Sequence, residues 1–432
     1  MATIDKSEAI RIKAFLTAAP VAPGIHSHFI NVGTDQILET LEDNYFKEEM
    51  PLGISCFKYL QGYYGSGKTQ FINSLAARAW QNNIVTSIVS VGAECPFNSP
   101  LAIYQSIVRS MFPPPKSGYA PEDDRGIEVI FRHYIQQKLH QYGIEDGQSV
   151  PSEIKIIIEQ PFSEMYIGAP DMQTAIALQH LGRTMLSMAC GGTVSPADFE
   201  IISWLRGDDV KSKHMKDLGL QKPAKDDNAF NRLKTIIMFM SKRMGVKGFY
   251  IAFDEGYRTA SFRRGSVKQN QAIENLLSMI NDGADGRFPG VMFMYAATPD
   301  FRNEVIRKYP ALNDRIGDIA FKPGSPMVPF IDLDALDTDS IVRQMGKRLL
   351  AVFGVALDTK WDMDVQTHNI DSLLEAEKST FGFGSEIRRA FVYHFCIILS
   401  TQKNDQHKLS ADEMRDFIQN HVIPSVNNDG EE

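Results

Sequence analysis

The chain has 432 residues, of which 43% are hydrophobic, and its formal net charge is -8. This length and content allow a large core divided over two or three domains, and the negative charge argues against a dedicated nucleic-acid coat while allowing a local basic face. The cysteines are too scattered for a metal knuckle or a redox pair, which suits a reducing cytosol; they are Cys56, Cys95, Cys190 and Cys396. With no signal-peptide region and no apolar run near the roughly 18 residues of a membrane span, we expect a soluble cytoplasmic protein without a membrane partner.

The first 50 residues are predicted to form a helical lead-in. Ala9, Ile12 and Leu16 belong to one apolar stripe that the prolines near position 20 interrupt, and a second helix is expected over residues 35–45. Between them, residues 28–33 carry apolar side chains. These side chains either wall an adenine or pack the first helix onto the core, and the sequence leaves both interpretations open.

Residues 62–69 match the phosphate-binding loop pattern G-x-x-x-x-G-K-[ST] without a mismatch. Its glycines take positive φ and let phosphate oxygens approach the backbone, Lys68 supplies a charge for the β and γ phosphates, and the Thr69 hydroxyl is placed to bind Mg²⁺. A strand-like stretch over 54–60 precedes the loop and a helical pattern follows it, as an anion site at a helix N-terminus requires. We therefore expect ATP bound by Gly62, Tyr63, Tyr64, Gly65, Ser66, Gly67, Lys68 and Thr69.

The chain after this loop alternates between one more strand and a long helical stretch. Residues 84–91 form a β-branched run typical of a strand, and a helix is expected around 101–111. From 116 to 244 the pattern is helical, and the only strand that it suggests is 154–158. So long a stretch exceeds a simple crossover, so we interpret it as an inserted helical subdomain.

Residues 248–253 form a wholly apolar run that ends in Asp254 and Glu255, as a central strand of a parallel sheet does. Ligands bind at the carboxyl edge of such sheets. Asp254 is therefore predicted to hold Mg²⁺, and Glu255 to orient or deprotonate the attacking water. An ordinary strand end is the alternative.

Two further polar residues follow the next elements. A fourth strand over 291–297 ends in Thr298, which is expected to hydrogen-bond the attacking water or the γ-phosphate, with a helix cap as the alternative. Arg315 ends a helix over 309–316 and is expected to complete a neighbouring subunit's site in trans, with a salt-bridged surface arginine as the alternative.

Residues 337–422 are again predicted to be helical. The segment 382–390 opens one of these helices with two arginines, and we expect this lid to carry Arg388, rather than Arg389, onto the bound phosphates. A basic cluster after the acids either touches nucleic-acid phosphates or is a solvated helix start; it comprises Arg258, Arg263, Arg264 and Lys268.

The loop, the acid-ended strand, the Thr298 and Arg315 pair and the lid segment together resemble the AAA+ and initiator-type ATPases. The segments 64–71, 204–207 and 248–255, in that order, look like the ATP-binding proteins of bacteriophage-exclusion (BREX) defence systems, in particular the short BrxD-like members. Many relatives in the wider superfamily place asparagine where this chain has Thr298. The resemblance implies a bacterial cytoplasmic ATPase that self-associates in a ring or filament and works beside other defence proteins, including a helicase, on DNA.

The expected fold is therefore α/β: a P-loop NTPase of the AAA+/ASCE type, with a parallel sheet, a long helical insertion and a C-terminal helical lid. We expect a lead-in over 1–50, core segments over 51–115 and 245–335, the insertion over 116–244 and the lid over 336–432. The predicted function is an ATPase that remodels or loads partner proteins on DNA in anti-phage defence. The alternative is a slow nucleotide-dependent switch or scaffold that docks partners without hydrolysis.

Overall fold

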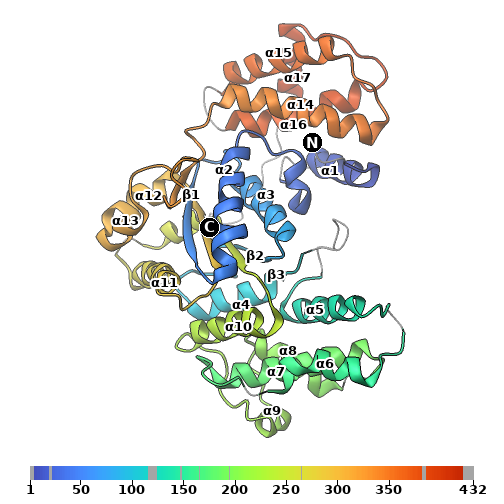
Figure 1. Cartoon of the computed structure of the whole chain (residues 1–432). Coiled ribbons are helices and arrows are strands. Elements are labelled where there is room, and N and C mark those ends of the chain that lie inside the picture. Colours follow the sequence, from blue (N-terminus) through green and yellow to red (C-terminus); the bar gives the residue numbers. More distant parts are fainter. Residues whose placement is uncertain are drawn as a thin grey trace.

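The computed structural model describes residues 4–18, 22–114, 124–145, 148–164, 166–193, 195–263, 265–381 and 386–421. These residues form a central α/β part, with the helices of 338–420 at one end and those of 127–217 at the other (Figure 1). Among the described residues, none of the helices combines the length and apolarity that crossing a bilayer requires.

The sheet has six strands in the order β3-β2-β4-β5-β1-β6, and all neighbours are parallel except β2 and β3. The predicted α/β class with a mainly parallel sheet is therefore confirmed. In chain order the strands are β1 (Cys56–Gln61), β2 (Val85–Ser90), β3 (Met111–Phe112), β4 (Phe249–Asp254), β5 (Val291–Ala297) and β6 (Phe330–Asp332).

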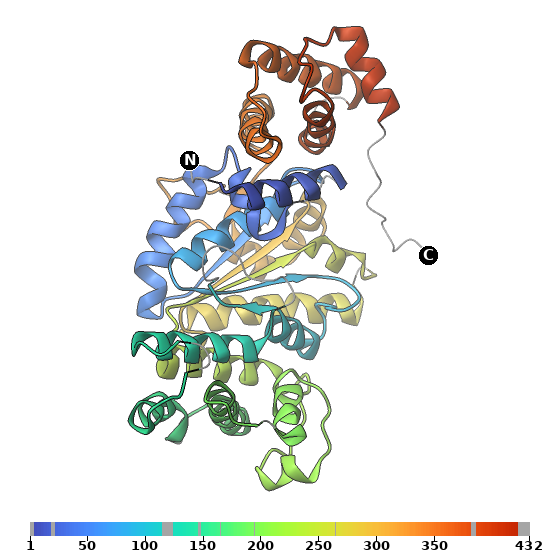
Figure 2. The same cartoon turned by 90° about the vertical axis from the view of Figure 1, so that its right-hand side faces the viewer.

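The sheet is buried on both faces, because successive side chains of one strand enter different hydrophobic clusters. In β4, Tyr250 and Ala252 pack with α3 (Lys68–Gln81), while Ile251 and Phe253 pack with α11 (Val267–Ala284). Figure 2 shows the sheet between these two helices. The α3 face is completed by α2 (Asp35–Leu41) and the wider turns of η2 (Glu42–Glu49).

The helices beyond the sheet form a helical block, which comprises α5 (Ile127–Gln141), α6 (Ser152–Ser163), α7 (Met172–Ala189), α8 (Pro196–Leu205), α9 (Lys213–Asp217) and α10 (Ala229–Met244). Its hydrophobic cluster is continuous with the underside of the sheet, through α4 (Pro100–Ser110) and α11. The helical block therefore has no hydrophobic core separate from that of the sheet among the described residues.

The strand expected at 154–158 is wrong, since these residues lie in α6. Ile158 is buried and Ile154 packs partly against the core, one helical turn apart, whereas Ile156 and Ile157 are exposed. Pairs at i and i+4 lie on one helix face, so tertiary packing selected the helical period over the β-branched propensity.

The tryptophan segment that contributes to the family resemblance has a structural role. Trp204 is buried, and the Arg232 guanidinium stacks 3.6 Å from its ring centroid and donates to its carbonyl oxygen at 3.2 Å. Arg206 forms an ion pair with Glu128, and the Gly207 carbonyl accepts from Gln105 at 2.9 Å. The segment thus joins α8 to α10, α5 and α4.

The C-terminal helices are α14 (Thr338–Leu357), α15 (Met363–Phe381), α16 (Glu386–Thr401) and α17 (Ala411–Asn420). The N-terminal helix α1 (Lys6–Ala18) packs into their cluster together with Ile30, while α2 packs on the α3 face of the sheet. The burial of Ile30 beside α1 favours the interpretation that residues 28–33 pack the first helix onto the core. The predicted lid residues 382–385 and the residues from 422 onward, which include the polar tail expected over 427–432, lie outside the described residues.

Candidate nucleotide site

The loop of residues 62–69 leaves β1 at the carboxyl edge of the sheet and enters α3. Gly65 and Gly67 have φ of +77° and +93°, in the region that favours glycine. A Cβ at Gly62 would lie 2.1 Å from Ser66 Oγ, so only glycine fits there. Positive φ is therefore found at Gly65 and Gly67, whereas at Gly62 the requirement for glycine comes from the missing Cβ alone.

Lys68 is buried and bends back over its own loop. Its ammonium donates to the carbonyl oxygens of Gly62 at 2.7 Å and Tyr63 at 2.9 Å. Burial lowers the pKa of Lys68, and the nearby carboxylate of Asp254 opposes this shift. Phosphate oxygens carry negative charge and the two carbonyl oxygens do not. A buried ammonium group should therefore exchange the carbonyls for phosphate oxygens when nucleotide binds.

Thr69 and Asp254 meet although 185 positions separate them: Thr69 Oγ1 donates to Asp254 Oδ2 at 2.5 Å. Asp254 is 8% exposed, and burial raises the pKa of its carboxyl group. A hydroxyl and a carboxylate oxygen are the hard ligands that Mg²⁺ prefers, and the ion commonly completes its shell with water and phosphate oxygens. The pair therefore fits the predicted metal. No cluster of three or more His, Cys, Asp or Glu side chains suited to a metal occurs in the described ranges.

Glu255 lies at the same edge, and its carboxylate is bonded to Ser90 and Arg258. Its φ of +57° is unusual for a residue other than glycine, and its Oε2 accepts from Ser90 Oγ at 2.8 Å and pairs with Arg258 Nη2 at 3.1 Å. Ser90 ends β2, on the side of β4 opposite to β5 and β1. The carboxylate is thus held toward β2.

Thr298 follows β5, which lies between β4 and β1. The carbonyl of the preceding Ala297 accepts from the Gly62 N–H at 3.2 Å, so Thr298 is beside the start of the loop. Its side chain is buried and makes no capping bond to α12 (Pro299–Glu304), although it holds the N-cap position. The Thr298 hydroxyl is therefore not used as a helix cap, and its hydrogen bond to the attacking water or the γ-phosphate stays a prediction.

Arg388 reaches the loop from α16. It is buried, and its guanidinium donates to Ser66 O at 3.1 Å, to Leu336 O at 3.0 Å and to Thr338 Oγ1 at 3.0 Å. Burial lowers the pKa of Arg388. The contact is with the loop backbone, so the arginine joins the C-terminal helices to the loop.

Arg315 lies apart from these contacts, and of the basic cluster Arg258 alone among the described residues takes part in them. Arg315, exposed on α13 (Pro310–Ile316), donates from Nε to Asn281 Oδ1 of α11 at 3.2 Å. Of the cluster, Arg258 pairs with Glu255, Arg263 and Lys268 are exposed, and Arg264 lies outside the described residues.

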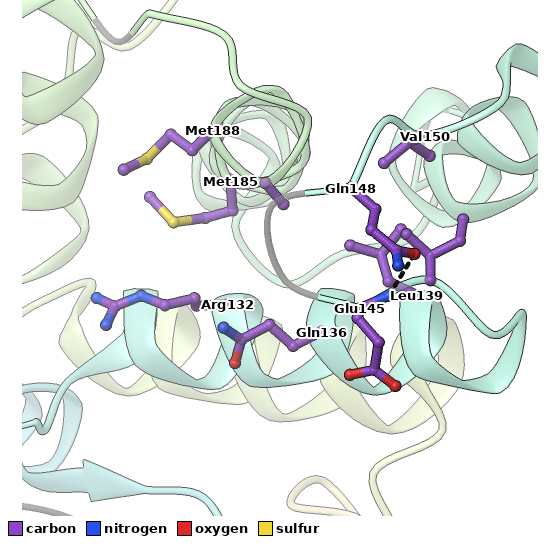
Figure 3. A pocket seen from close by; sticks show the side chains of 10 residues that line it. Arg132, Gln136, Leu139, Glu145, Gln148, Val150, Met185 and Met188 are labelled. Atoms are coloured by element: carbon purple, nitrogen blue, oxygen red, sulfur yellow. Dashed lines mark hydrogen bonds between the residues drawn. The ribbon is translucent and has the colours of Figure 1, made fainter.

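A cavity of about 270 Å³ lies in the helical block rather than at the loop. Figure 3 shows Arg132 and Gln136 of α5 facing Met185 and Met188 of α7 across it. None of the predicted site residues lines this cavity.

A sequence model of the BREX system ATP-binding protein BrxC/D family matches residues 5–416. The chain belongs to this family. The resemblance derived from the motifs is therefore confirmed, and family membership supports ATP as the ligand and a role in BREX defence. No curated protein shows a significant match to the chain.

Sequence reasoning missed Asp334, whose carboxylate accepts from the Tyr63 N–H through Oδ2 at 2.9 Å and Oδ1 at 3.2 Å. The apolar pair of residues 330 and 331 ends in Asp332, so the pattern that identified Asp254 would have pointed to Asp332 and not to Asp334, two residues further on. A strand of three residues is too short to be recognised by alternation.

Proposed function

We propose that this protein binds ATP and Mg²⁺ at the loop of residues 62–69, hydrolyses the nucleotide, and uses the cycle to remodel or load partner proteins on DNA during anti-phage defence. The observation that carries the proposal is the 2.5 Å hydrogen bond from Thr69 to Asp254. This bond brings the loop and the end of the acid strand β4 together at one edge of the sheet, where a triphosphate and its metal ion need both. Membership of an ATP-binding family supports the same ligand.

In this proposal the loop N–H groups and Lys68 bind the phosphates, and Thr69 and Asp254 hold the metal ion. The Mg²⁺ ion, when bound, supplies positive charge that stabilises the phosphate oxygens. Glu255 takes a proton from the attacking water once its carboxylate has left Ser90 and Arg258. Thr298 orients the water or the γ-phosphate, Arg388 reports nucleotide binding to the C-terminal helices, and Arg315 completes a neighbour's site.

The fold that we propose is a P-loop NTPase of the AAA+ type. Its core comprises residues 51–115 and 245–335, with a lead-in over 1–50, a helical insertion over 116–244 and a lid over 336–432. The strand order, with β5 between the acid strand β4 and the loop strand β1, supports this proposal.

Phosphate release by the purified protein tests the enzyme proposal. Lys68→Ala should abolish release by weakening ATP binding, while Glu255→Gln should retain ATP binding and lower release by about 100-fold or more. The exposed residues Lys347 and Glu375 offer matched controls, Lys347→Ala and Glu375→Gln, which should behave as wild type. If either Lys68→Ala or Glu255→Gln releases phosphate at the wild-type rate, the assignment of that residue to the site is wrong.

The second candidate is a slow nucleotide-dependent switch that docks partners without hydrolysis. The engagement of Glu255 with Ser90 and Arg258 favours it, since a carboxylate held toward β2 is not placed to activate a water at the loop. Under this candidate Glu255→Gln retains partner binding, and a non-hydrolysable ATP analogue supports it as well as ATP does. A partner complex that forms only during hydrolysis favours the first function.

The partners that we propose are further copies of this chain, a helicase or other defence proteins, and DNA, all in the cytoplasm. Arg263 and Lys268 are the exposed members of the basic cluster that would contact DNA phosphates. Each such contact contributes about 0.9 to the slope of log affinity against log salt. An equal slope after Arg263→Ala and Lys268→Ala would exclude these two residues as DNA contacts.

A further inference from the structure

The peptide group between Gly62 and Tyr63 is bonded at both of its polar atoms. Its carbonyl oxygen, that of Gly62, accepts from the Lys68 ammonium at 2.7 Å. Its N–H, that of Tyr63, donates to the Asp334 carboxylate at 2.9 Å and 3.2 Å. One peptide unit therefore lies between an anion and the cation of the phosphate-binding loop.

We infer that Asp334 is a positioning residue for nucleotide binding, which fixes the Gly62–Tyr63 peptide and, through its carbonyl, the Lys68 ammonium. The inference deepens the proposed function and rests on it for the role of Lys68. Hydrogen bonds in such a chain polarise one another, so the carboxylate strengthens the carbonyl as an acceptor for Lys68. Without Asp334 the peptide is held only through its carbonyl, and ATP binding must then bear part of the cost of ordering the start of the loop.

The backbone explains how Asp334 comes to this place. Strand β6 pairs with β1 so that Asp332 lies opposite Gln61, and the Leu333 N–H donates to Gln61 O at 3.0 Å. Two residues past the end of β6, Asp334 is therefore level with Tyr63. Its own N–H donates to Asp332 Oδ1 at 3.0 Å, which fixes the turn.

The same turn is held from the other side by Arg388. The Arg388 guanidinium donates to Leu336 O at 3.0 Å and to Leu333 O at 3.4 Å, and it also contacts Ser66 O of the loop. The segment that carries Asp334 is thus braced against both the loop and α16. Burial raises the pKa of the Asp334 carboxyl group, while Lys68 and Arg388 favour its charged form.

The first measurement is hydrogen exchange of the Tyr63 amide in the nucleotide-free protein, resolved to single residues. Asp334→Ala should remove the protection of this amide, whereas Asp334→Asn should retain part of it, because the amide oxygen still accepts. Wild-type exchange of Tyr63 in Asp334→Ala would overturn the inference. This readout does not depend on ATP binding, so it stays informative if the proposed function fails.

The second measurement is the dissociation constant of a fluorescent ATP analogue with Mg²⁺. Asp334→Ala should weaken binding about tenfold, as expected for loss of a hydrogen bond to a charged group, and Asp334→Asn should weaken it less. The control is Asp300→Ala, which removes an exposed negative charge just after β5. Loss of charge alone should tighten binding of an anion, so equal behaviour of the two alanine variants would overturn the inference. Failure of the wild-type protein to bind the analogue would instead contradict the proposed function.

Discussion

Burial at the candidate site makes the charged form of Asp254 unfavourable in the folded protein. The side chain is 8% exposed, and burial raises the pKa of its carboxyl group even though Thr69 and the Glu255 N–H donate to it. A folded-state pKa above the ordinary value means that the native state retains its proton to higher pH than the unfolded chain does. The carboxyl therefore contributes most to stability below its ordinary pKa, and this contribution falls as pH rises toward the folded-state pKa.

We therefore expect Asp254→Asn to stabilise the ligand-free protein at pH 7.5. The asparagine removes a buried charge, its Oδ1 can accept from the Glu255 N–H and its NH2 group can donate to Thr69 Oγ1, so the gain in unfolding free energy should be about 1 to 3 kcal/mol. The measurement is thermal unfolding with and without ATP, in the presence and absence of Mg²⁺. The variant should lose the extra stabilisation that Mg²⁺ adds to ATP, and a wild-type response to Mg²⁺ would contradict the metal role of Asp254.

At the scale of elements, one buried pair joins three of the C-terminal helices. Glu377 of α15 and His394 of α16 are both fully buried and share a short hydrogen bond, and His394 Nε2 lies 2.7 Å from the carbonyl oxygen of His421 after α17. A carbonyl accepts only, so Nε2 carries a proton and a second proton is shared between Nδ1 and the carboxyl group. Burial raises the pKa of Glu377, which His394 opposes.

We expect His394→Ala to destabilise the protein by about 3 to 5 kcal/mol, because it leaves a buried carboxyl group without its partner. Glu377→Gln should cost less, since the glutamine amide donates to a neutral His394 Nδ1. Urea unfolding followed by circular dichroism measures both. Equal losses for the two variants would contradict this account, and His368→Ala, at an exposed position on α15, is the control for loss of a histidine.

At the scale of the whole molecule, the proposed trans role of Arg315 predicts that ATP promotes assembly. Arg315 is exposed, and its described bond to Asn281 ties it to α11 rather than to the loop of its own chain. The site would then be complete only in an assembly, and ATP would favour assembly by bridging two chains.

The expected result is that ATP and Mg²⁺ increase the mass of Glu255→Gln protein in light scattering, and that adding Arg315→Ala abolishes the increase. Arg343→Ala, which removes an exposed arginine paired with Asp371 on the C-terminal helices, should leave it unchanged. A constant mass with and without nucleotide would contradict the trans role of Arg315.

The sequence by itself determined the features that depend on neighbouring residues. The glycines of 62–69 and the helix after them follow from local sterics, and the apolar run before Asp254 indicated a strand buried on both faces. The same local reasoning failed at 154–158, where a β-branched run is helical, and it missed β3 and β6, because strands of two and three residues carry no measurable period.

The tertiary structure alone decided which side chains meet. Strand order placed Asp254 against Thr69, turned Glu255 toward Ser90, and brought Asp334 to the Tyr63 N–H. It also seated Arg388 on the Ser66 carbonyl and gave Arg258 an ion-pair partner in Glu255. These contacts join residues that only sheet register and helix packing bring within reach, and register is set by the burial of whole faces rather than by any local pattern.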